Sequence, residues 1–271
     1  MKQTRVPGTQ AVRRAVSLLK AFTAEQPRRG LAELSRSLRL NKTTTFRLLQ
    51  ALEGEGLVAR TADGEAYQLG PELLTLAGRA QGAHELRAAA RPELQSLARA
   101  TRETATLEVL VGREALVLDE EMGGYMIGAR PSVGARWPAH AASTGKVLLA
   151  FLPQERLAEA LQAQWPALTP RTMTGAALGR ALARVRERGF ATAIEELEVG
   201  YVAVGAPVRD GSGTVVGALS VGGPRTRMGA DRLAACARQV VAAARRASAR
   251  MGHGAAERPD WKPAAGEGKG R

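Results

Sequence analysis

The sequence has little of what several classes of protein require. Its one cysteine, Cys236, excludes an internal disulfide, and only three histidines accompany it, which excludes a zinc site of ordinary ligand count. It has no run of the roughly 18 apolar residues that a membrane helix needs. The basic start, residues 1–7, is followed by no apolar segment typical of a secretory signal. We therefore expect a cytoplasmic protein that has no membrane partner, no metal site and no cofactor.

Basic charge is plentiful and is concentrated near the start of the chain. The 271 residues, 45% hydrophobic and 24% charged, are typical of a folded protein with two domains. The first 60 residues hold twelve basic and four acidic side chains, so they carry +8 of the net charge of +13 and leave +5 for the other 211. Such concentration favours a polyanionic partner, because phosphate contacts release counterions. The alternative is that arginine-rich coding gives a basic surface that has no partner.

The first 70 residues contain three short helical patterns followed by a hairpin pattern. Apolar residues recur at helical spacing in three segments: 10–24, 31–38 and 42–55. Two strand-like segments then flank a turn: 57–60 and 66–69. Asn41 is a suitable N-cap for the third helix, and we expect Phe46, Leu49 and Leu52 to pack that helix against the other two. This order of elements predicts a winged helix-turn-helix domain.

Polar side chains occupy the N-terminal half of the third helix. Short side chains there can approach base edges in the major groove of DNA, a long one can reach a guanine or a phosphate, and the free helix amides can bind a phosphate. The residues expected to contact DNA are Lys42, Thr43, Thr44, Arg47 and Gln50 of this helix and Arg60 beside the hairpin turn. The alternative is that Thr43 and Thr44 belong to a capped first turn and that Arg47 is a solvated surface residue. The whole block of elements favours DNA.

The remainder of the chain has the pattern of a second domain. A helix that starts at Pro71 leads into another over residues 85–100, with a break near Gly82 or Pro92. The expected divisions are residues 1–78, residues 79–252 and a disordered tail, residues 253–271. Strands are predicted at 104–111, 115–119, 202–208 and 214–221, and helices at 145–152, 154–163, 176–188 and 231–251. Helices around hairpin-connected strands predict an α+β domain and not a βαβ repeat.

Motifs for catalysis are incomplete. Residues 143–146, Ser-Thr-Gly-Lys, resemble the end of a phosphate-binding loop, but His140 stands where that loop needs glycine and Val147 follows the lysine. Cys236 lies on the apolar side of a helical pattern and is interpreted as a core residue. Three acidic residues, Glu195, Glu196 and Glu198, have no partner at a meaningful spacing and are interpreted as a solvated strand end or loop. We therefore predict no catalytic residue and no enzymatic activity.

Small residues gather in three segments of the second domain. These segments are residues 141–145, at the start of a helix, and residues 203–207 and 220–224, within strands. Helix N-termini present free amides that suit a carboxylate, so the three segments together could line a ligand pocket. Close backbone packing would also require glycine and alanine, and the sequence leaves both interpretations open. His140, just before the first segment, could contact a ligand or serve a structural role.

The sequence resembles the IclR family of bacterial transcriptional regulators from about Ala11 to Gly252. In the first domain the likeness is carried by Arg14–Leu19, Asn41–Leu49 and Tyr67–Gly70. In the second it is carried by Pro138–Lys146, Leu168–Thr172, Arg188–Ala191, Ala206–Asp210 and Leu219–Pro224. The resemblance implies an N-terminal winged helix-turn-helix, a linker helix and a GAF-like effector domain with a mixed sheet. It also implies a homodimer or tetramer on palindromic operators, controlled by a small metabolite that is often an organic or aromatic acid.

The resemblance also implies which positions bind the effector. These positions are Trp137, His140, Ser143, Thr144, Gly145, Ala193, Ala203, Ser220 and Gly222. This chain departs from members that bind small acids, because Ala193, Ala203 and Gly222 replace polar or sulfur side chains and Trp137 replaces an aliphatic one. A less polar cavity beside an indole suits an aromatic or lactone-like ligand better than a two-carbon acid.

The leading hypothesis is a ligand-responsive, DNA-binding transcriptional regulator, such as a repressor. A second hypothesis is an enzyme that converts a small molecule and uses its helix-turn-helix as an interaction module. A third is a non-specific nucleic-acid-binding protein, which the overall charge favours. Loss of sequence preference on Arg47→Ala would separate the first hypothesis from the third.

Overall fold

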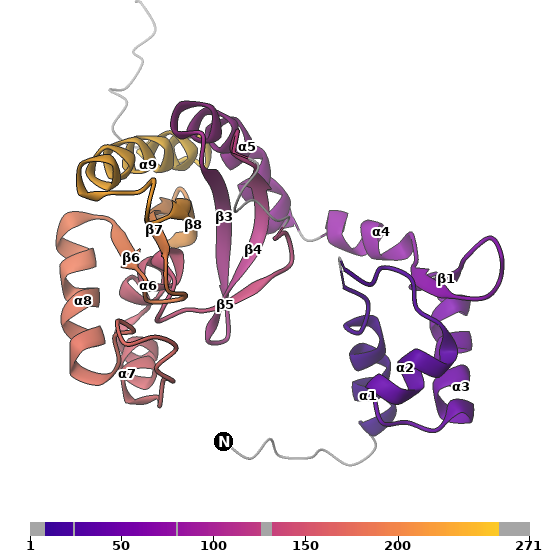
Figure 1. Cartoon of the computed structure of the whole chain (residues 1–271). Coiled ribbons are helices and arrows are strands. Elements are labelled where there is room, and N and C mark those ends of the chain that lie inside the picture. Colours follow the sequence, from indigo (N-terminus) through magenta and orange to yellow (C-terminus); the bar gives the residue numbers. More distant parts are fainter. Residues whose placement is uncertain (1–8, 24, 80, 126–131, 255–271) are drawn as a thin grey trace, which may run out of the picture. The chain divides into compact units, whose positions relative to one another are not determined.

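The chain forms two compact units, residues 1–81 and residues 82–271, in the computed structural model (Figure 1). Residues 9–23, 25–79, 81–125 and 132–254 are described, so the predicted tail lies outside the described residues from position 255 onward. Each unit has a hydrophobic core of its own.

The first unit is a winged helix-turn-helix. Its elements are α1 (Gln10–Leu19), α2 (Leu31–Ser37), α3 (Lys42–Gly54), β1 (Val58–Arg60), β2 (Tyr67–Leu69) and α4 (Glu72–Arg79). The two strands pair antiparallel, with Val58 opposite Leu69, as the hairpin pattern predicts. One apolar core joins the helices to the hairpin through Leu18, Phe22, Leu34, Leu49, Leu52, Val58 and Tyr67. The predicted fold of this unit is confirmed.

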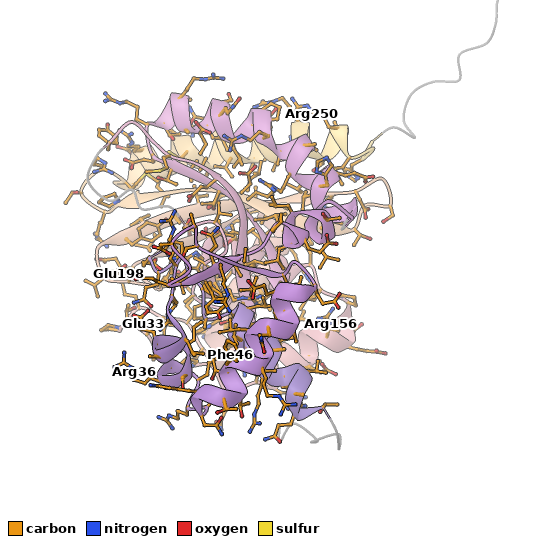
Figure 2. The ribbon with its side chains drawn as sticks, turned by 90° about the vertical axis from the view of Figure 1, so that its right-hand side faces the viewer. Glu33, Arg36, Phe46, Arg156, Glu198 and Arg250 are labelled. Carbon is orange, nitrogen blue, oxygen red and sulfur yellow. The ribbon has the colours of Figure 1, made fainter. Side chains whose placement is uncertain are left out.

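One predicted core residue of α3 is wrong. Phe46, labelled on α3 in Figure 2, is half-buried and does not belong to the core, whereas Thr45 is fully buried. Thr45, Leu49 and Leu52 are spaced by four and three residues and therefore share one helix face, from which Phe46 is displaced by about 100°. Thr45 tolerates burial because its hydroxyl donates to the Asn41 carbonyl (3.1 Å).

The second unit is a six-stranded sheet covered by helices on both faces. Its helices are α5 (Gln81–Thr101), α6 (Ser143–Ala150), α7 (Gln154–Gln162), α8 (Gly175–Arg188) and α9 (Ala230–Arg250). Its strands are β3 (Thr104–Val111), β4 (Glu114–Glu121), β5 (Arg136–Pro138), β6 (Ala191–Ile194), β7 (Tyr201–Arg209) and β8 (Val215–Pro224). The strand order is β5-β4-β3-β8-β7-β6, and all of these described pairs are antiparallel. The predicted α+β class is confirmed.

Strand alternation divides the sheet into two faces with separate cores. On one face, α5 and α9 cover residues such as Leu107, Val204 and Leu219. They are also joined by ion pairs from Arg246 and Arg250 to the buried Glu93 (2.6 and 2.8 Å). Figure 2 labels Arg250 on α9, and Figure 1 shows α8 on the other side of this unit from α5. The helices α6, α7 and α8 form the second core with the opposite face of the sheet.

The helix α5 runs through both positions where the sequence predicts a break. Gly82 and Pro92 lie inside it, and the helix continues to Thr101. An interior proline costs about 3 kcal/mol, but α5 buries Leu86, Leu94 and other apolar side chains against the sheet. Tertiary packing therefore outweighs the local preference.

Candidate functional sites

The exposed face of α3 carries most of the side chains predicted to contact DNA. Lys42, Thr43, Arg47 and Gln50 are exposed, and Thr44 is half-buried. The Asn41 side chain caps the helix by accepting from the Thr44 amide (2.7 Å), as predicted. Within the described part of the chain, neither Lys42 nor Arg47 forms an ion pair. Their charges are therefore available to a polyanion.

Arg60 differs from these residues because it already has partners. Its Nε lies 3.3 Å from an oxygen of Glu53 on α3, and its guanidinium carbon lies 5.2 Å from the centre of the Tyr67 ring. A half-exposed pair of this kind contributes about 0–1 kcal/mol and weakens in salt. Contact with a phosphate would require Arg60 to exchange one weak pair for another.

The N-terminus of α6 lies directly against the sheet of the second unit. Ser143, Thr144 and Gly145 are all buried there. A Cβ on Gly145 would lie 2.2 Å from the Ala139 carbonyl oxygen, and one on Gly205 of β7 would lie 3.1 Å from the Thr144 nitrogen. Glycine is therefore needed at position 145 to admit the neighbouring backbone.

Four of the predicted effector positions form one patch of the sheet beside α6. Ala193 of β6 is opposite Ala203 of β7, which is opposite Gly222 of β8. Ser220, two residues before Gly222, shares that face because side chains alternate along a strand. The structure thus brings Ala193, Ala203, Ser220 and Gly222 together.

A buried polar cluster, which the sequence did not reveal, adjoins this patch. Glu108 of β3 is 4% exposed, and its two oxygens accept from the hydroxyls of Thr144 (2.5 Å) and Thr106 (2.8 Å). The Thr106 hydroxyl is also 2.8 Å from that of Ser220. Burial raises the pKa of Glu108, although the two hydroxyls partly oppose that shift. We call Thr106, Glu108, Thr144 and Ser220 the Glu108 cluster.

Tyr201 of β7 extends the Glu108 cluster toward Gly222. Its hydroxyl occupies the space beside Gly222, where a Cβ would lie 2.0 Å from that oxygen. Burial, and then the charge of Glu108, raise the pKa of the Tyr201 hydroxyl, so it remains protonated at neutral pH. A hydroxyl donor therefore lies beside Gly222, where the sequence indicates a less polar cavity.

Two other predicted effector positions have different surroundings. Trp137 lies on β5, at one edge of the sheet, and is separated from β8 by β4 and β3. His140 is fully buried, with its ring 4.6 Å from that of Trp165 and its Nε2 2.8 Å from the Pro166 carbonyl. Burial lowers the pKa of His140. His140 thus contacts Trp165 and the Pro166 carbonyl, and the sheet order separates Trp137 from the small-residue patch.

The interpretation of Glu196 as solvated is wrong. Glu196 is 3% exposed, and both of its oxygens lie 2.6 Å from the Lys146 amino group, which is itself 2% exposed and also donates to the Thr192 carbonyl (2.5 Å). The pair joins α6 to the segment after β6. Burial lowers the pKa of Lys146, and the charge of Glu196 opposes that shift. Glu195 is half-buried and pairs with Arg171 and Arg225, whereas Glu198 is exposed.

The described residues offer no clear centre for other chemistry. No three of their His, Cys, Asp and Glu side chains gather as a metal ion would require. Cys236 is buried, and burial raises the pKa of its thiol, which disfavours the nucleophilic thiolate. A cavity of about 760 Å³ between α5 and β4 is lined by none of the predicted site residues. No helix in the described ranges is both long and apolar enough to span a membrane.

Comparison with known proteins assigns both units to one family. Residues 11–62 match the IclR helix-turn-helix domain, and residues 79–249 match the bacterial transcriptional regulator IclR C-terminal domain. The glycerol operon regulatory protein of Streptomyces griseus is 35% identical over 82% of this chain and 87% of that protein. The HTH-type transcriptional regulator KdgR of Escherichia coli (strain K12) is 32% identical over 88% of this chain and 93% of that protein.

Solved structures agree with this assignment. The structure of an IclR homolog from Microbacterium hydrocarbonoxydans, complexed with 4-hydroxybenzoate, matches this chain with a TM-score of 0.80 at 28% identity. The match covers 89% of this chain and 99% of that one. A winged helix-turn-helix with a separate ligand-binding sheet domain defines a DNA-binding transcriptional regulator that responds to a small molecule. The chain belongs to the IclR family of bacterial transcriptional regulators.

Proposed function

We propose that α3 is the DNA recognition helix and that the hairpin contacts the flanking backbone. The contacts come from Lys42, Thr43, Thr44, Arg47, Gln50 and Arg60. The observation that carries this proposal is the exposed N-terminal half of α3, where Lys42 and Arg47 form no ion pair within the described residues. Thr43 and Thr44 are short enough to let the helix enter a major groove, and Arg47 can reach a guanine edge.

The effector site proposed here lies where the start of α6 meets β3, β7 and β8. The small-residue patch of Ala193, Ala203 and Gly222 supports it, together with the hydroxyls of the Glu108 cluster. Ser143 and Gly145 complete the first turn of α6, while His140 and Trp137 flank the site more distantly. The effector is a small metabolite drawn from the classes that the sequence indicates, an organic or aromatic acid or a lactone-like compound.

Effector binding alters operator binding through α5. This helix begins at Gln81, where the first unit ends, and packs along the sheet face opposite α6. A shift of the sheet can therefore move the start of α5, which links the two units. Typical coupling free energies between two sites are about 1–3 kcal/mol, which changes affinity by about 5- to 150-fold. We propose that the protein acts as a repressor in the cytoplasm, where chromosomal DNA is accessible.

A homodimer, or a tetramer of two such dimers, is the proposed assembly. Exposed apolar side chains on α1 and α4 support it, namely Val12, Val16, Leu74 and Leu76. Such residues favour an apolar contact with a second copy of the chain. Two recognition helices would then meet half-sites about one helical turn apart.

DNA binding is tested by fluorescence anisotropy with the chain's own promoter region and a shuffled duplex across a salt series. Arg47→Ala should reduce the preference for promoter DNA by about 1–3 kcal/mol, the value of a good base contact. Arg156→Ala is the matched control, because Arg156 is an exposed arginine of α7 in the second unit (Figure 2) and should leave binding unchanged. A flat salt response, or equal binding to both duplexes, would refute the proposal.

The alternative, an enzyme with an interaction module, makes a different prediction in the same material. Turnover of a bound small molecule, with no preference for promoter DNA, would support it. The described residues favour regulation, because the buried carboxyl of Glu108 contacts hydroxyls and the carboxylate of Glu196 is held by Lys146. Both carboxyl groups therefore already have partners within the chain.

A further inference from the structure

We propose that Glu108 makes the effector site selective for an uncharged polyhydroxy compound, such as a polyol, a sugar or a sugar lactone, over a carboxylate. This inference rests on the proposed effector site and deepens it. Of the effector classes that the sequence indicates, it keeps the uncharged lactone-like compound and sets aside the acids, and it adds polyols and sugars.

The carboxyl of Glu108 lies at the start of α6, in the proposed effector site. A helix N-terminus favours an anion through its free amides and its dipole, and at the start of α6 the chain supplies that group itself. One oxygen of Glu108 accepts from the side-chain hydroxyl of Thr144, the second residue of α6, at 2.5 Å. An incoming carboxylate would have to share this end of the helix with Glu108.

Among the described residues, no cation forms an ion pair with Glu108 that could offset a second negative charge. Its hydrogen-bond partners are the hydroxyls of Thr106 and Thr144, and its charge helps to raise the pKa of the Tyr201 hydroxyl. The buried amino group of Lys146 already donates to Glu196 and to a backbone carbonyl. Two carboxylates that share a buried site cannot both remain ionised at low cost, so an acid is disfavoured there.

The donors and acceptors of the site match hydroxyl groups. Glu108 can accept, and the hydroxyls of Thr106, Thr144, Ser220 and Tyr201 can each donate and accept. A ligand hydroxyl also does both, so it can donate to the carboxylate and accept from a neighbouring hydroxyl. The side chains of the patch are small, and the Tyr201 hydroxyl lies beside Gly222 at its edge. An uncharged polyhydroxy compound therefore satisfies the Glu108 cluster without bringing charge into it.

Paired probes that differ only by CH2OH against COO⁻ test this inference. The pairs are glycerol and glycerate, xylitol and xylonate, and sorbitol and gluconate, each titrated into the full-length protein by calorimetry and by thermal shift. For at least one pair, the neutral member should bind at least about tenfold more tightly than the acid. Lowering the pH through the raised pKa of Glu108 should shrink that ratio in the wild type, because Glu108 then becomes neutral.

Glu108→Gln should narrow the same ratio without any change of pH, because it removes the charge and keeps the size. Glu114→Gln is the matched control, since Glu114 is an exposed glutamate at the start of β4. Preference for the acid, an unchanged ratio in Glu108→Gln, or no binding by any pair would overturn the inference.

These results are distinguishable from failure of the proposed function. If Glu108→Gln and Thr144→Val both bind the probes as the wild type does, the effector site lies elsewhere and both proposals fail. If the neutral preference holds but the protein ignores promoter DNA, the ligand inference stands and the proposed function is wrong.

Discussion

Removing the amino group of Lys146 should lower the stability of the second unit far more than any surface substitution does. Lys146→Met keeps most of the side chain's length but leaves Glu196 buried without its partner, 3% exposed and facing the space that the amino group held at 2.6 Å. Breaking a buried pair in this way costs about 3–5 kcal/mol. For a domain of this size, each kcal/mol lowers Tm by about 2–4 °C, so the fall should be roughly 6–20 °C.

The double variant Lys146→Met/Glu196→Leu shows how much of the lost stability comes from the ion pair itself and how much from the unpaired buried charge of Glu196. Replacing a whole buried pair by apolar groups is often neutral or stabilising, so the double variant should recover most of the stability that the single variant loses. Arg136→Met is the control, because Arg136 and Glu114 form a 3.5 Å pair whose side chains are 39% and 48% exposed. Such a surface pair contributes about 0–1 kcal/mol.

Tryptophan fluorescence during urea unfolding is the appropriate assay. All tryptophans of the chain follow residue 82, and Trp137 and Trp165 belong to the described part of the second unit. The signal therefore reports that unit and not the helix-turn-helix. A Lys146→Met variant within about 1 kcal/mol of the wild type would refute the claim that the pair is desolvated.

Three further predictions concern the same two units. Asn41→Ala removes the cap of α3 and should lower the stability of the first unit by about 0.5–2 kcal/mol, measured by thermal unfolding of its helical circular dichroism. Gly145→Ala should lower the Tm of the second unit because its Cβ meets backbone at 2.2 Å, whereas Gly179→Ala, with 3.7 Å to the nearest atom, should not. Glu108→Gln should gain stability relative to the wild type as the pH rises above about 4.5. Because the pKa of Glu108 is raised in the folded state, the wild type loses stability as the pH rises toward that pKa, and the glutamine variant does not. Equal pH profiles of the two proteins in urea unfolding would contradict this.

Local patterns in the sequence predict much of the fold because they are decided by neighbours in the chain. Helical spacing predicts α2, α3 and α9, turn residues predict the three hairpins β1–β2, β3–β4 and β7–β8, and Gly189 ends α8 in the left-handed conformation that glycine favours. The edge strands β5 and β6 escape notice because three or four residues are too few to show alternation. The continuation of α5 through Pro92 depends on distant packing, which no local pattern reveals.

The candidate sites show the same division. The exposed residues of α3 follow from helix periodicity and the Asn41 cap, and the small residues of the patch are visible in the strands. Glu108 is not, because a glutamate within an alternating strand is typical of a solvated face, and burial depends on α6 packing there. Lys146 and Glu196 are 50 residues apart, so only the folded chain makes them partners. Trp137 is assigned to the effector site through the family resemblance, and its place on the edge strand β5 is visible only in the folded sheet.

The most direct test of the central claim is a footprint of the full-length protein on its own promoter region, by hydroxyl-radical cleavage. The proposed recognition by paired α3 helices predicts protection in two symmetric half-sites about one helical turn apart on one face of the duplex. Arg47→Ala should weaken this protection pattern, whereas Arg156→Ala should preserve it. Uniform protection along the duplex, or an identical pattern in both variants, would contradict the claim that α3 recognises DNA sequence.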